Sequence, residues 1–417
     1  MGTPSDPWEP LGLNLTWQGD PATAITVDWH VESPDQAAEL EFRVSGEGNW
    51  EPHGVAETLD FPFSPRYIHR NEVTGLQPDT EYEFRFGAQS AVYRFRTMPA
   101  ENLHQPVRLV FGGDVRSSLE GMIRTAEVAM TYDPHAVVFG GDLAYANGDP
   151  RRVDRWYEWF ETTRDVFRAP DGRIVPVIVA IGNHELWGTR RLDEDELHLE
   201  EEWGLYDDFP TYFTTIFPHP TGTSYRVVDV GNYLSLFLLD SDHLEDVVGD
   251  QTDWLEAALE GRTHVPHLIP VYHVPAYPSV RSFDGGTSTR IRENWSPLFE
   301  AHGVRVSFEN HDHAYKRTFP IRGGEIDPAG VVYIGDGAWG VSPREIGRDH
   351  DEGAWYLKRA AGEHNFILAT LHGPHQHFLM VDAEGNILDE YPQVLTRPGA
   401  GGVPVAERLA PLRNARP

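Results

Sequence analysis

The chain has 417 residues, of which 40% are hydrophobic and 12% aromatic, and a formal net charge of −31. At about 100–200 residues per domain this length predicts two or three domains, and the apolar content excludes a disordered or collagen-like chain. The acidic balance argues against binding to nucleic acid or to an anionic membrane, because both partners need a basic surface. No apolar run approaches the ~20 residues of a membrane helix.

The sequence contains no cysteine, which excludes disulfides, a thiolate nucleophile and a cysteine-ligated zinc site. The N-terminal stretch Met1–Trp17 has neither the basic start nor the apolar centre of a secretory signal. The sequence by itself therefore leaves the compartment unknown.

The first hundred residues have the pattern of a β-sandwich. Short alternating runs are interrupted by turn residues every ~8–12 positions. The segment Leu76–Tyr82 resembles the fibronectin type III signature, in which a Leu-Pro turn precedes a strand with a buried tyrosine. We therefore expect an all-β, fibronectin type III-like sandwich plus linker over residues 1–104. The expected strands are Ala24–His30, Leu40–Val44 and Ala91–Arg96.

From Pro106 onward, apolar runs of strand length alternate with helix-compatible segments such as Leu119–Met130 and Asp154–Arg164. This alternation predicts an α/β domain whose sheet is covered on both faces, and we place it at residues 105–395. Residues 396–417 are expected to form an extended C-terminal tail. The expected strands are Val107–Phe111, Ala136–Phe139, Val175–Ile181, Tyr233–Leu239, His267–Tyr272 and Val304–Phe308.

Two clusters of polar residues could be taken for metal sites, but each has a simpler interpretation. The acid-rich segment Arg190–Asp208 is interpreted as a solvated helix face. The stretch Ile367–Ile387 has the pattern of a hairpin that turns at Glu384-Gly-Asn386, which accounts for the nearby histidines without a metal. Those histidines are His364, His372, His375 and His377.

Several of the expected strands end in loops that carry ligands for hard metal ions. The carboxyl ends of strands form the site in such sheets, so we expect these loops to converge. A single Gly-Asp is usually a turn, and a single histidine is usually a hydrogen-bonded residue. The whole set is what indicates a metal centre. Its seven donors are Asp114, Asp142, Tyr145, Asn183, His273, His311 and His313.

The motifs around these donors resemble those of the calcineurin-like metallophosphoesterases. They are Gly-Asp, Gly-Asp-x-x-Tyr, Gly-Asn-His-Glu, Val-x-His and x-His-x-His, and the tyrosine makes the series similar to the purple acid phosphatases. The resemblance covers about residues 20–395. It implies a four-layer α/β/β/α sandwich behind the fibronectin-like domain, and an acid phosphatase-like hydrolase. It also implies a secreted or periplasmic protein, although the sequence shows no signal peptide.

The resemblance assigns each donor to one of two metals. Asp114, Tyr145 and His313 would bind Fe(III), and Asp142 would bridge. Asn183, His273 and His311 would bind Zn, Mn or Fe(II). Phenolate and carboxylate suit a hard trivalent ion, whereas imidazoles and an amide suit a divalent one. A shared carboxylate sets two cations ~3.5–4 Å apart, as in two-metal hydrolysis.

Two residues depart from the family pattern. Asn310 stands where the family usually has glycine before the first of the last two histidines. If that glycine serves a positive φ, asparagine is the least costly replacement, so we expect the loop to survive. Arg116 replaces a glycine two residues after Asp114, and we assign it a possible contact with substrate phosphate through its fork, against a solvent-facing alternative.

The expected reaction is hydrolysis of phosphate monoesters by a metal-bound hydroxide, without a covalent intermediate. We expect His184 to protonate the leaving oxygen or hold phosphate, with a hydrogen-bonding role beside the ligands as the alternative. His243 could enter the site from another loop. Glu185 is expected to support the loop or a ligand histidine.

Family members often supply further histidines in the loop after the His273 motif, but Pro275–Arg290 contains none. Its polar candidates are Tyr277, Arg281 and Arg290.

Two alternative functions remain open at this stage. A phosphodiesterase or nucleotidase of the same superfamily would use the same metals, although Tyr145 favours the monoesterase group. A non-catalytic binding protein would be favoured by missing donors, and none is missing. We expect a small phosphate ester as substrate and neither nucleic acid nor membrane as partner. The sequence does not predict the natural substrate, the oligomeric state or the pH optimum.

Overall fold

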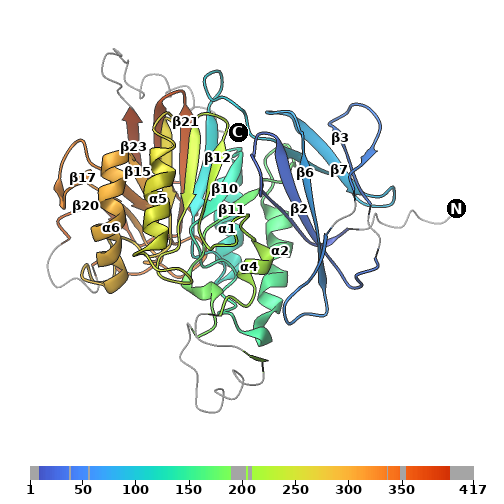
Figure 1. Ribbon diagram of the computed structural model, residues 1–417, viewed down its shortest axis with the longest axis horizontal. Helices are drawn as coiled ribbons and strands as arrows, with labels where there is room; N and C mark the ends of the chain where they lie inside the picture. Colours follow the sequence, from blue (N-terminus) through green and yellow to red (C-terminus); the bar gives the residue numbers. More distant parts are fainter. Residues whose placement is uncertain are drawn as a thin grey trace.

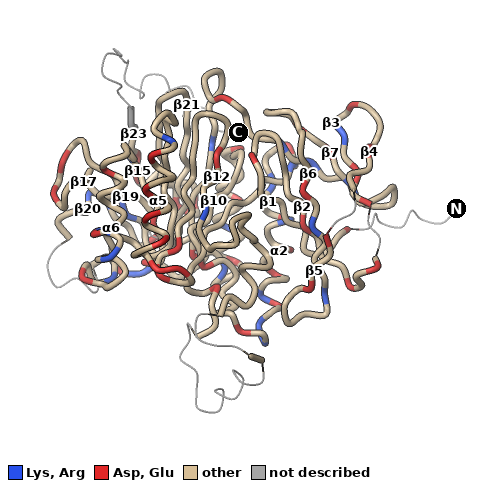
Figure 2. Tube along the Cα trace, in the orientation of Figure 1, with Lys and Arg blue, Asp and Glu red and all other residues tan. Residues whose placement is uncertain are grey.

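The structure is a computed structural model that describes residues 9–36, 39–54, 57–188, 203–204, 209–335, 337–347 and 354–394. The acid-rich segment 190–208, apart from residues 203–204, and the tail 396–417 lie outside the described residues. Within these ranges, no helix has the length and apolar character needed to cross a bilayer. Acidic residues occur throughout both the N-terminal and the C-terminal parts of the described fold (Figure 2).

The N-terminal region is a sandwich of two four-stranded antiparallel sheets, ordered β1-β2-β6-β5 and β4-β3-β7-β8. Trp17, Trp29 and Phe84 are completely buried in its core. The Tyr82 hydroxyl accepts a 2.8 Å hydrogen bond from the backbone N–H of Gln77, which closes the turn that the sequence indicated. The strands are β1(Leu11–Thr16), β2(Ala24–Val31), β3(Leu40–Val44), β4(Glu51–Pro52), β5(Glu57–Asp60), β6(Tyr67–Thr74), β7(Glu81–Phe86) and β8(Tyr93–Arg96).

The first sheet of the second region has the order β11-β10-β9-β21-β22-β23. Its β9, β10 and β11 are parallel, and the hairpin strands are antiparallel. The predicted turn at Glu384-Gly385 joins β22 to β23, and a further turn at Gly373 joins β21 to β22. The strands are β9(Val107–Gly112), β10(Ala136–Phe139), β11(Val177–Val179), β21(Asn365–His372), β22(His375–Asp382) and β23(Ile387–Val394).

The second sheet has the order β12-β13-β14-β15-β19-β16-β20, with β13, β14, β15 and β19 parallel. A small hairpin of β17(Ile321–Arg322) and β18(Glu325–Ile326) lies between β16 and β19 in the chain. The strands of the sheet are β12(Arg226–Val230), β13(Leu234–Leu238), β14(His267–Val271), β15(Val306–Glu309), β16(Tyr315–Thr318), β19(Val332–Gly335) and β20(Leu357–Ala361).

Helices cover the outer face of each sheet, which gives the predicted α/β/β/α layers (Figure 1). Helices α1(Leu119–Met130) and α2(Asp154–Val166) bury Met122, Trp159 and their neighbours against the first sheet. Helices α5(Asp250–Glu260) and α6(Gly286–His302) bury apolar residues such as Trp295 against the second sheet. The shorter elements are η1(Pro150–Arg152), η2(Asn183–Glu185) and α4(Phe213–Ile216).

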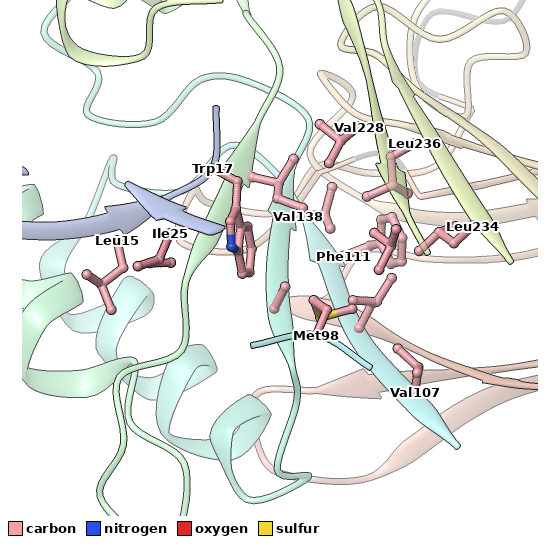
Figure 3. Packing of buried hydrophobic residues seen from close by; sticks show 14 of the residues in the cluster. Leu15, Trp17, Ile25, Met98, Val107, Phe111, Val138, Val228, Leu234 and Leu236 are labelled. Atoms are coloured by element: carbon pink, nitrogen blue, oxygen red, sulfur yellow. The ribbon is translucent and has the colours of Figure 1, made fainter. Parts of the chain in front are cut away.

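The inner faces of the two sheets share one core, which continues into the N-terminal sandwich (Figure 3). Phe111 of β9 stacks on Phe308 of β15 with ring centroids 3.8 Å apart. Trp17 of the N-terminal region belongs to the same buried cluster as Val228 of β12. The packed sheets therefore hold the carboxyl ends of β9, β10, β14 and β15 close to one another.

Candidate metal centre

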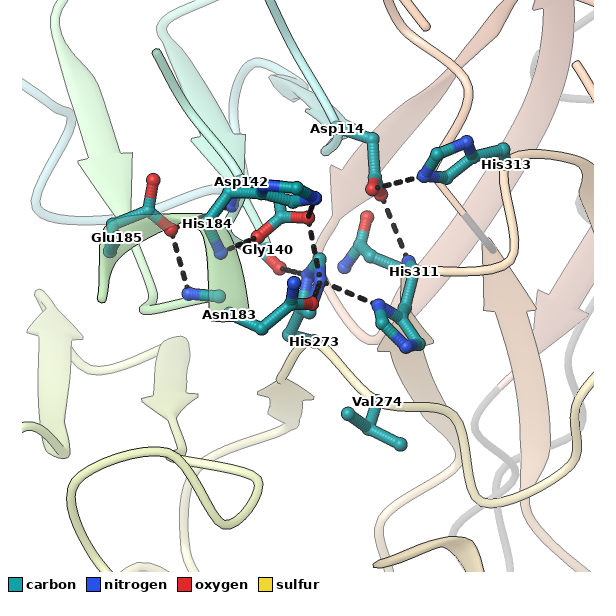
Figure 4. Close-up of polar contacts among 12 residues, drawn as sticks. Asp114, Gly140, Asp142, Asn183, His184, Glu185, His273, Val274, His311 and His313 are labelled. Atoms are coloured by element: carbon teal, nitrogen blue, oxygen red, sulfur yellow. Dashed lines mark hydrogen bonds and ion pairs between the residues drawn. The ribbon is translucent and has the colours of Figure 1, made fainter. Parts of the chain in front are cut away.

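The seven predicted donors lie in the turns that follow β9, β10, β11, β14 and β15. Figure 4 labels all of them except Tyr145. Five of them have a positive φ between 55° and 76°. Side-chain-bearing residues rarely adopt this left-handed region, and such strain gathers at functional sites. The turns after β9, β10 and β15 therefore place left-handed residues at the donor positions. The five residues are Asp114, Asp142, Tyr145, His311 and His313.

One group of donors surrounds the carboxylate of Asp114, which is completely buried. Its Oδ1 lies 3.0 Å from His313 Nε2 and accepts a 3.0 Å hydrogen bond from the Tyr145 hydroxyl. Its Oδ2 accepts a 2.9 Å bond from the backbone N–H of His311. The structure therefore brings Asp114, Tyr145 and His313 together.

A second group surrounds the imidazole of His273 (Figure 4). Its Nδ1 donates a 2.8 Å hydrogen bond to the carbonyl of Gly140, so Nε2 faces the site. This Nε2 lies 3.1 Å from Asn183 Oδ1, 3.0 Å from His311 Nδ1 and 3.2 Å from Asp142 Oδ2. Asp142 thus stands beside the group that contains Asn183, His273 and His311.

The electrostatics of the second group suit a cation. Asp142 Oδ2 is buried without a well-formed hydrogen bond, and ligand atoms of Asp142, His273 and His311 lie within 4.8 Å of one another. Burial opposes a charge on His273, yet the carboxylates of Asp142 and Asp114 raise its pKa to about 9. The converging acceptors thus favour a positive charge among them, and the residues fit a metal.

Tyr145 is a phenol that needs a strong cation to ionise. Burial, followed by the nearby carboxylates of Asp114 and Asp142, raises the pKa of Tyr145 well above its usual value. A phenolate here therefore requires a trivalent or similarly polarising ion to offset those two negative charges.

Glu185 holds the turn that carries Asp142. Its carboxylate accepts hydrogen bonds from the backbone N–H groups of Gly182 (2.9 Å), Asp142 (2.8 Å) and Leu143 (2.8 Å). Burial and the nearby Asp142 raise the pKa of Glu185 to about 8, although the backbone donors oppose this shift. The side chain supports the loop, as the sequence suggested, and is 1% exposed.

His184 lies over the site beside Tyr145. The two rings stack with centroids 4.2 Å apart, and His184 Nδ1 donates a 2.6 Å hydrogen bond to Asn147 Oδ1. This bond leaves Nε2 facing the donors, 3.7 Å from Asp142 Oδ2. Sequence reasoning missed Asn147, whose side chain fixes the His184 ring; the pair Asn147-Gly148 predicts a turn but not this contact.

His243 reaches the same site from the loop after β13. Its ring centroid lies 5.7 Å from that of His273, and its Nε2 is 3.3 Å from Ser241 Oγ. The backbone N–H of His243 donates a 2.7 Å bond to Asp240 Oδ1, which fixes the loop.

Arg116 pairs with an acidic residue of helix α2. Its guanidinium pairs with Glu158 of α2, and its side chain is only 7% exposed. Among the described residues, its ion pair is with Glu158 and with none of the seven donors. The sequence placed Arg116 near Asp114 but gave no sign that an acidic helix residue faces it.

The backbone conformation of Asn310 differs from the expected one. It lacks the positive φ that the sequence comparison with glycine suggested, and the left-handed residues are His311 and His313 instead. Its side chain donates a 3.0 Å hydrogen bond to the Tyr272 carbonyl. The loop accommodates asparagine because its side chain fills the space that Gly113 and Gly140, which have no side chains, leave open.

Two histidines of the β21–β22 region have protein partners for their side chains. His372 Nε2 donates to the Leu103 carbonyl at 3.0 Å, and His377 pairs with Glu390 at 2.8 Å. Among the described residues, a further grouping of close metal donors is Glu256, Glu260 and His302, which lies on the surface of α5 and α6 and includes none of these histidines.

Comparison with known proteins decides the family. Residues 107–315 match the calcineurin-like phosphoesterase family, a span of half the chain. The chain belongs to this family. Residues 10–97 of this phosphoesterase match the N-terminal domain of the purple acid phosphatases. The family implies a binuclear metal centre and a hydrolase that acts on phosphoric ester bonds.

Two curated relatives and one solved structure illustrate the likeness. The phosphoesterase is 25% identical to purple acid phosphatase 18 of Arabidopsis thaliana, over 79% of this chain and 73% of the relative. It is 26% identical to acid phosphatase type 7 of Mus musculus, over 91% and 90%. The purple acid phosphatase PPD1 from yellow lupin seeds shares its fold, with a TM-score of 0.74, 21% identity and coverage of 92% and 74%.

Proposed function

We propose that this protein hydrolyses phosphate monoesters at a two-cation centre formed by the seven donors. Asp114, Tyr145 and His313 would hold one cation, for which we propose Fe(III). Asn183, His273 and His311 would hold the other, for which we propose Zn, Mn or Fe(II). Asp142 would be shared. When bound, the cations activate a water molecule and neutralise charge that develops on the phosphate.

The observation that carries this proposal is the position of Asp142. One of its carboxylate oxygens accepts the backbone N–H of His184 at 2.7 Å, while Oδ2 has no well-formed hydrogen bond and faces His273. A buried carboxylate oxygen without a partner is costly, so its position among nitrogen and oxygen ligands supports a cation there.

The protein side chains around the centre supply binding and proton transfer. His184 keeps Nδ1 bonded to Asn147 and directs Nε2 to the site, which supports a role in holding phosphate or protonating the leaving oxygen. His243 approaches from the side of His273 and is the second candidate for that role. We leave Arg116 out of the reaction because Glu158 holds its guanidinium.

The metals are tested by elemental analysis and a visible absorption spectrum of the purified protein. We expect two metals per chain and an absorption band from tyrosinate bound to iron, which Tyr145→Phe removes. A colourless protein that hydrolyses esters with zinc alone would keep the hydrolase but exclude the iron assignment.

A diesterase or nucleotidase is the alternative within the superfamily. The hydroxyl of Tyr145, 3.0 Å from Asp114 Oδ1, favours the monoesterase. Rates for p-nitrophenyl phosphate and bis(p-nitrophenyl) phosphate separate the two. We expect a higher kcat/KM for the monoester, and the reverse order would establish the diesterase.

A further inference from the structure

The loop after His273 offers three polar candidates for contact with substrate, and the structure separates them. Tyr277 is 2% exposed, and its carbonyl accepts a hydrogen bond from Lys316. Arg290 donates to Asp242 Oδ2 at 2.7 Å through Nε, on the outside of the molecule. Arg281 differs from both because its guanidinium lies against the backbone of His311, one of the proposed ligands.

Within the described residues, one nitrogen of the Arg281 guanidinium makes all of that group's hydrogen bonds. Its Nη1 donates to the His311 carbonyl and, at 2.9 Å, to Asp312 Oδ1. Across the described ranges, neither Nε nor Nη2 of Arg281 has a hydrogen-bond partner, and the side chain is 33% exposed. The guanidinium thus presents a free donor edge beside the centre.

Hydrogen bonds fix the three loop residues that precede Arg281. Asp312 Oδ2 accepts the backbone N–H groups of Ser279 and Val280, both at 2.7 Å. The Pro278 carbonyl accepts a 2.6 Å bond from the Tyr356 hydroxyl. Because Asp312 stands between His311 and His313, one buried residue couples the position of Arg281 to the ligand turn.

We propose that Arg281 binds the phosphate group of the substrate through its free edge. This inference rests on the proposed phosphatase function. Because the loop contains no histidine, the inference assigns the contact with substrate to an arginine of the loop. A guanidinium fork matches the oxygens of a phosphate and makes stronger hydrogen bonds than a neutral donor. Its fixed loop reduces the entropy that is lost on binding.

The test uses the metal-loaded protein and the variant Arg281→Met. We expect the dissociation constant for inorganic phosphate, measured by calorimetry, and the KM for p-nitrophenyl phosphate to rise about 10- to 100-fold, because a charge-assisted hydrogen bond is lost. Arg281→Lys keeps the charge but not the fork, so it should recover part of the loss. Arg290→Met, which removes the neighbouring arginine that Asp242 holds, is the matched control and should change both values less than twofold.

Metal content and metal affinity by chelator competition are measured on every variant. Unchanged phosphate binding in Arg281→Met overturns the proposal, and so does a loss of phosphate binding that follows a loss of metal. Failure of the proposed function can be told apart from failure of this inference. A wild-type protein that shows no turnover can still bind phosphate, and that binding can still depend on Arg281.

Discussion

Glu309 and Lys316 form an ion pair whose two side chains are completely buried. Glu309 Oε1 also accepts the Tyr272 hydroxyl at 2.6 Å and the Ala276 backbone N–H at 2.7 Å. Tyr272 precedes His273, and Glu309 lies two residues before His311. The pair therefore ties together the two chain segments that carry the second group of donors.

Lys316→Met should destabilise the protein by about 3–5 kcal/mol, because it leaves the Glu309 carboxylate charged and buried without its partner. Urea denaturation measures this change in the free energy of unfolding. The double variant Glu309→Gln, Lys316→Met should recover much of the loss, since the amide oxygen still accepts from Tyr272. A cost below about 1 kcal/mol in the single variant would show that the pair does little for stability.

Glu185→Gln should weaken metal binding about 10- to 100-fold, the usual effect of removing a group that orients a ligand. The amide can no longer accept all three backbone N–H groups that Glu185 holds, so the turn carrying Asp142 shifts. Chelator competition measures the affinity. Glu127→Gln, a change of the same chemistry on the exposed face of α1, is the control, and an equal loss in both variants would contradict the explanation.

Gly140→Ala should destabilise the protein by about 1–3 kcal/mol through overpacking. A Cβ atom at Gly140 would lie 1.7 Å from Asn310 Nδ2. Asn310→Gly removes that amide, so the double variant should be more stable than the sum of the two single costs. A double-mutant cycle in urea should give a coupling energy of about 1–3 kcal/mol, and strictly additive costs would exclude this contact.

His267 should make stability depend on pH. Burial lowers its pKa to about 4, with Nε2 donating to the Gly373 carbonyl at 2.9 Å and Nδ1 accepting from Gln376 at 2.8 Å. The unfolded chain binds the proton near pH 6.5, so the contribution is present above that pH and is lost as pH falls towards 4.

The loss should be about 3 kcal/mol across this window. Free energies of unfolding at pH 7, 5.5 and 4 should therefore fall more steeply for the wild type than for His267→Gln. His264→Gln, on the surface, should behave as the wild type does. Parallel curves for the wild type and His267→Gln would show that His267 is not the group responsible.

The sequence predicted those elements whose hydrophobic pattern is local. The bounds of α1 and β10 match their expected ranges, because an apolar run or a helical period ends there at polar turn residues. The run Val175–Ile181 did not, since β11 covers only Val177–Val179. The residues on either side of β11 make backbone hydrogen bonds outside the assigned strand, from Val175 to Phe167 and from Ala180 to Phe139. An apolar run looks the same whether its backbone bonds belong to a strand or to a loop.

The sequence could predict that the seven donors lie at strand ends, because that depends on local pattern. Their convergence also needs the packing of two sheets, since β9, β10 and β11 belong to one sheet and β14 and β15 to the other. The direction of Arg116 depends instead on Glu158, forty-two positions away, which no local pattern reveals. The roles of Asn147 and Asp312 likewise appear only when separate turns meet in space.

The shared interior described above, in which Trp17 and Val228 belong to one buried cluster, has a consequence for cooperativity. Two domains that have separate cores can unfold one after the other. Here, unfolding of either the N-terminal sandwich or the phosphoesterase region exposes apolar surface of the other. Calorimetry should thus record a single endotherm. A phosphoesterase fragment cut free at the linker should be prone to aggregation, so the N-terminal sandwich serves the enzyme as part of its thermodynamic unit.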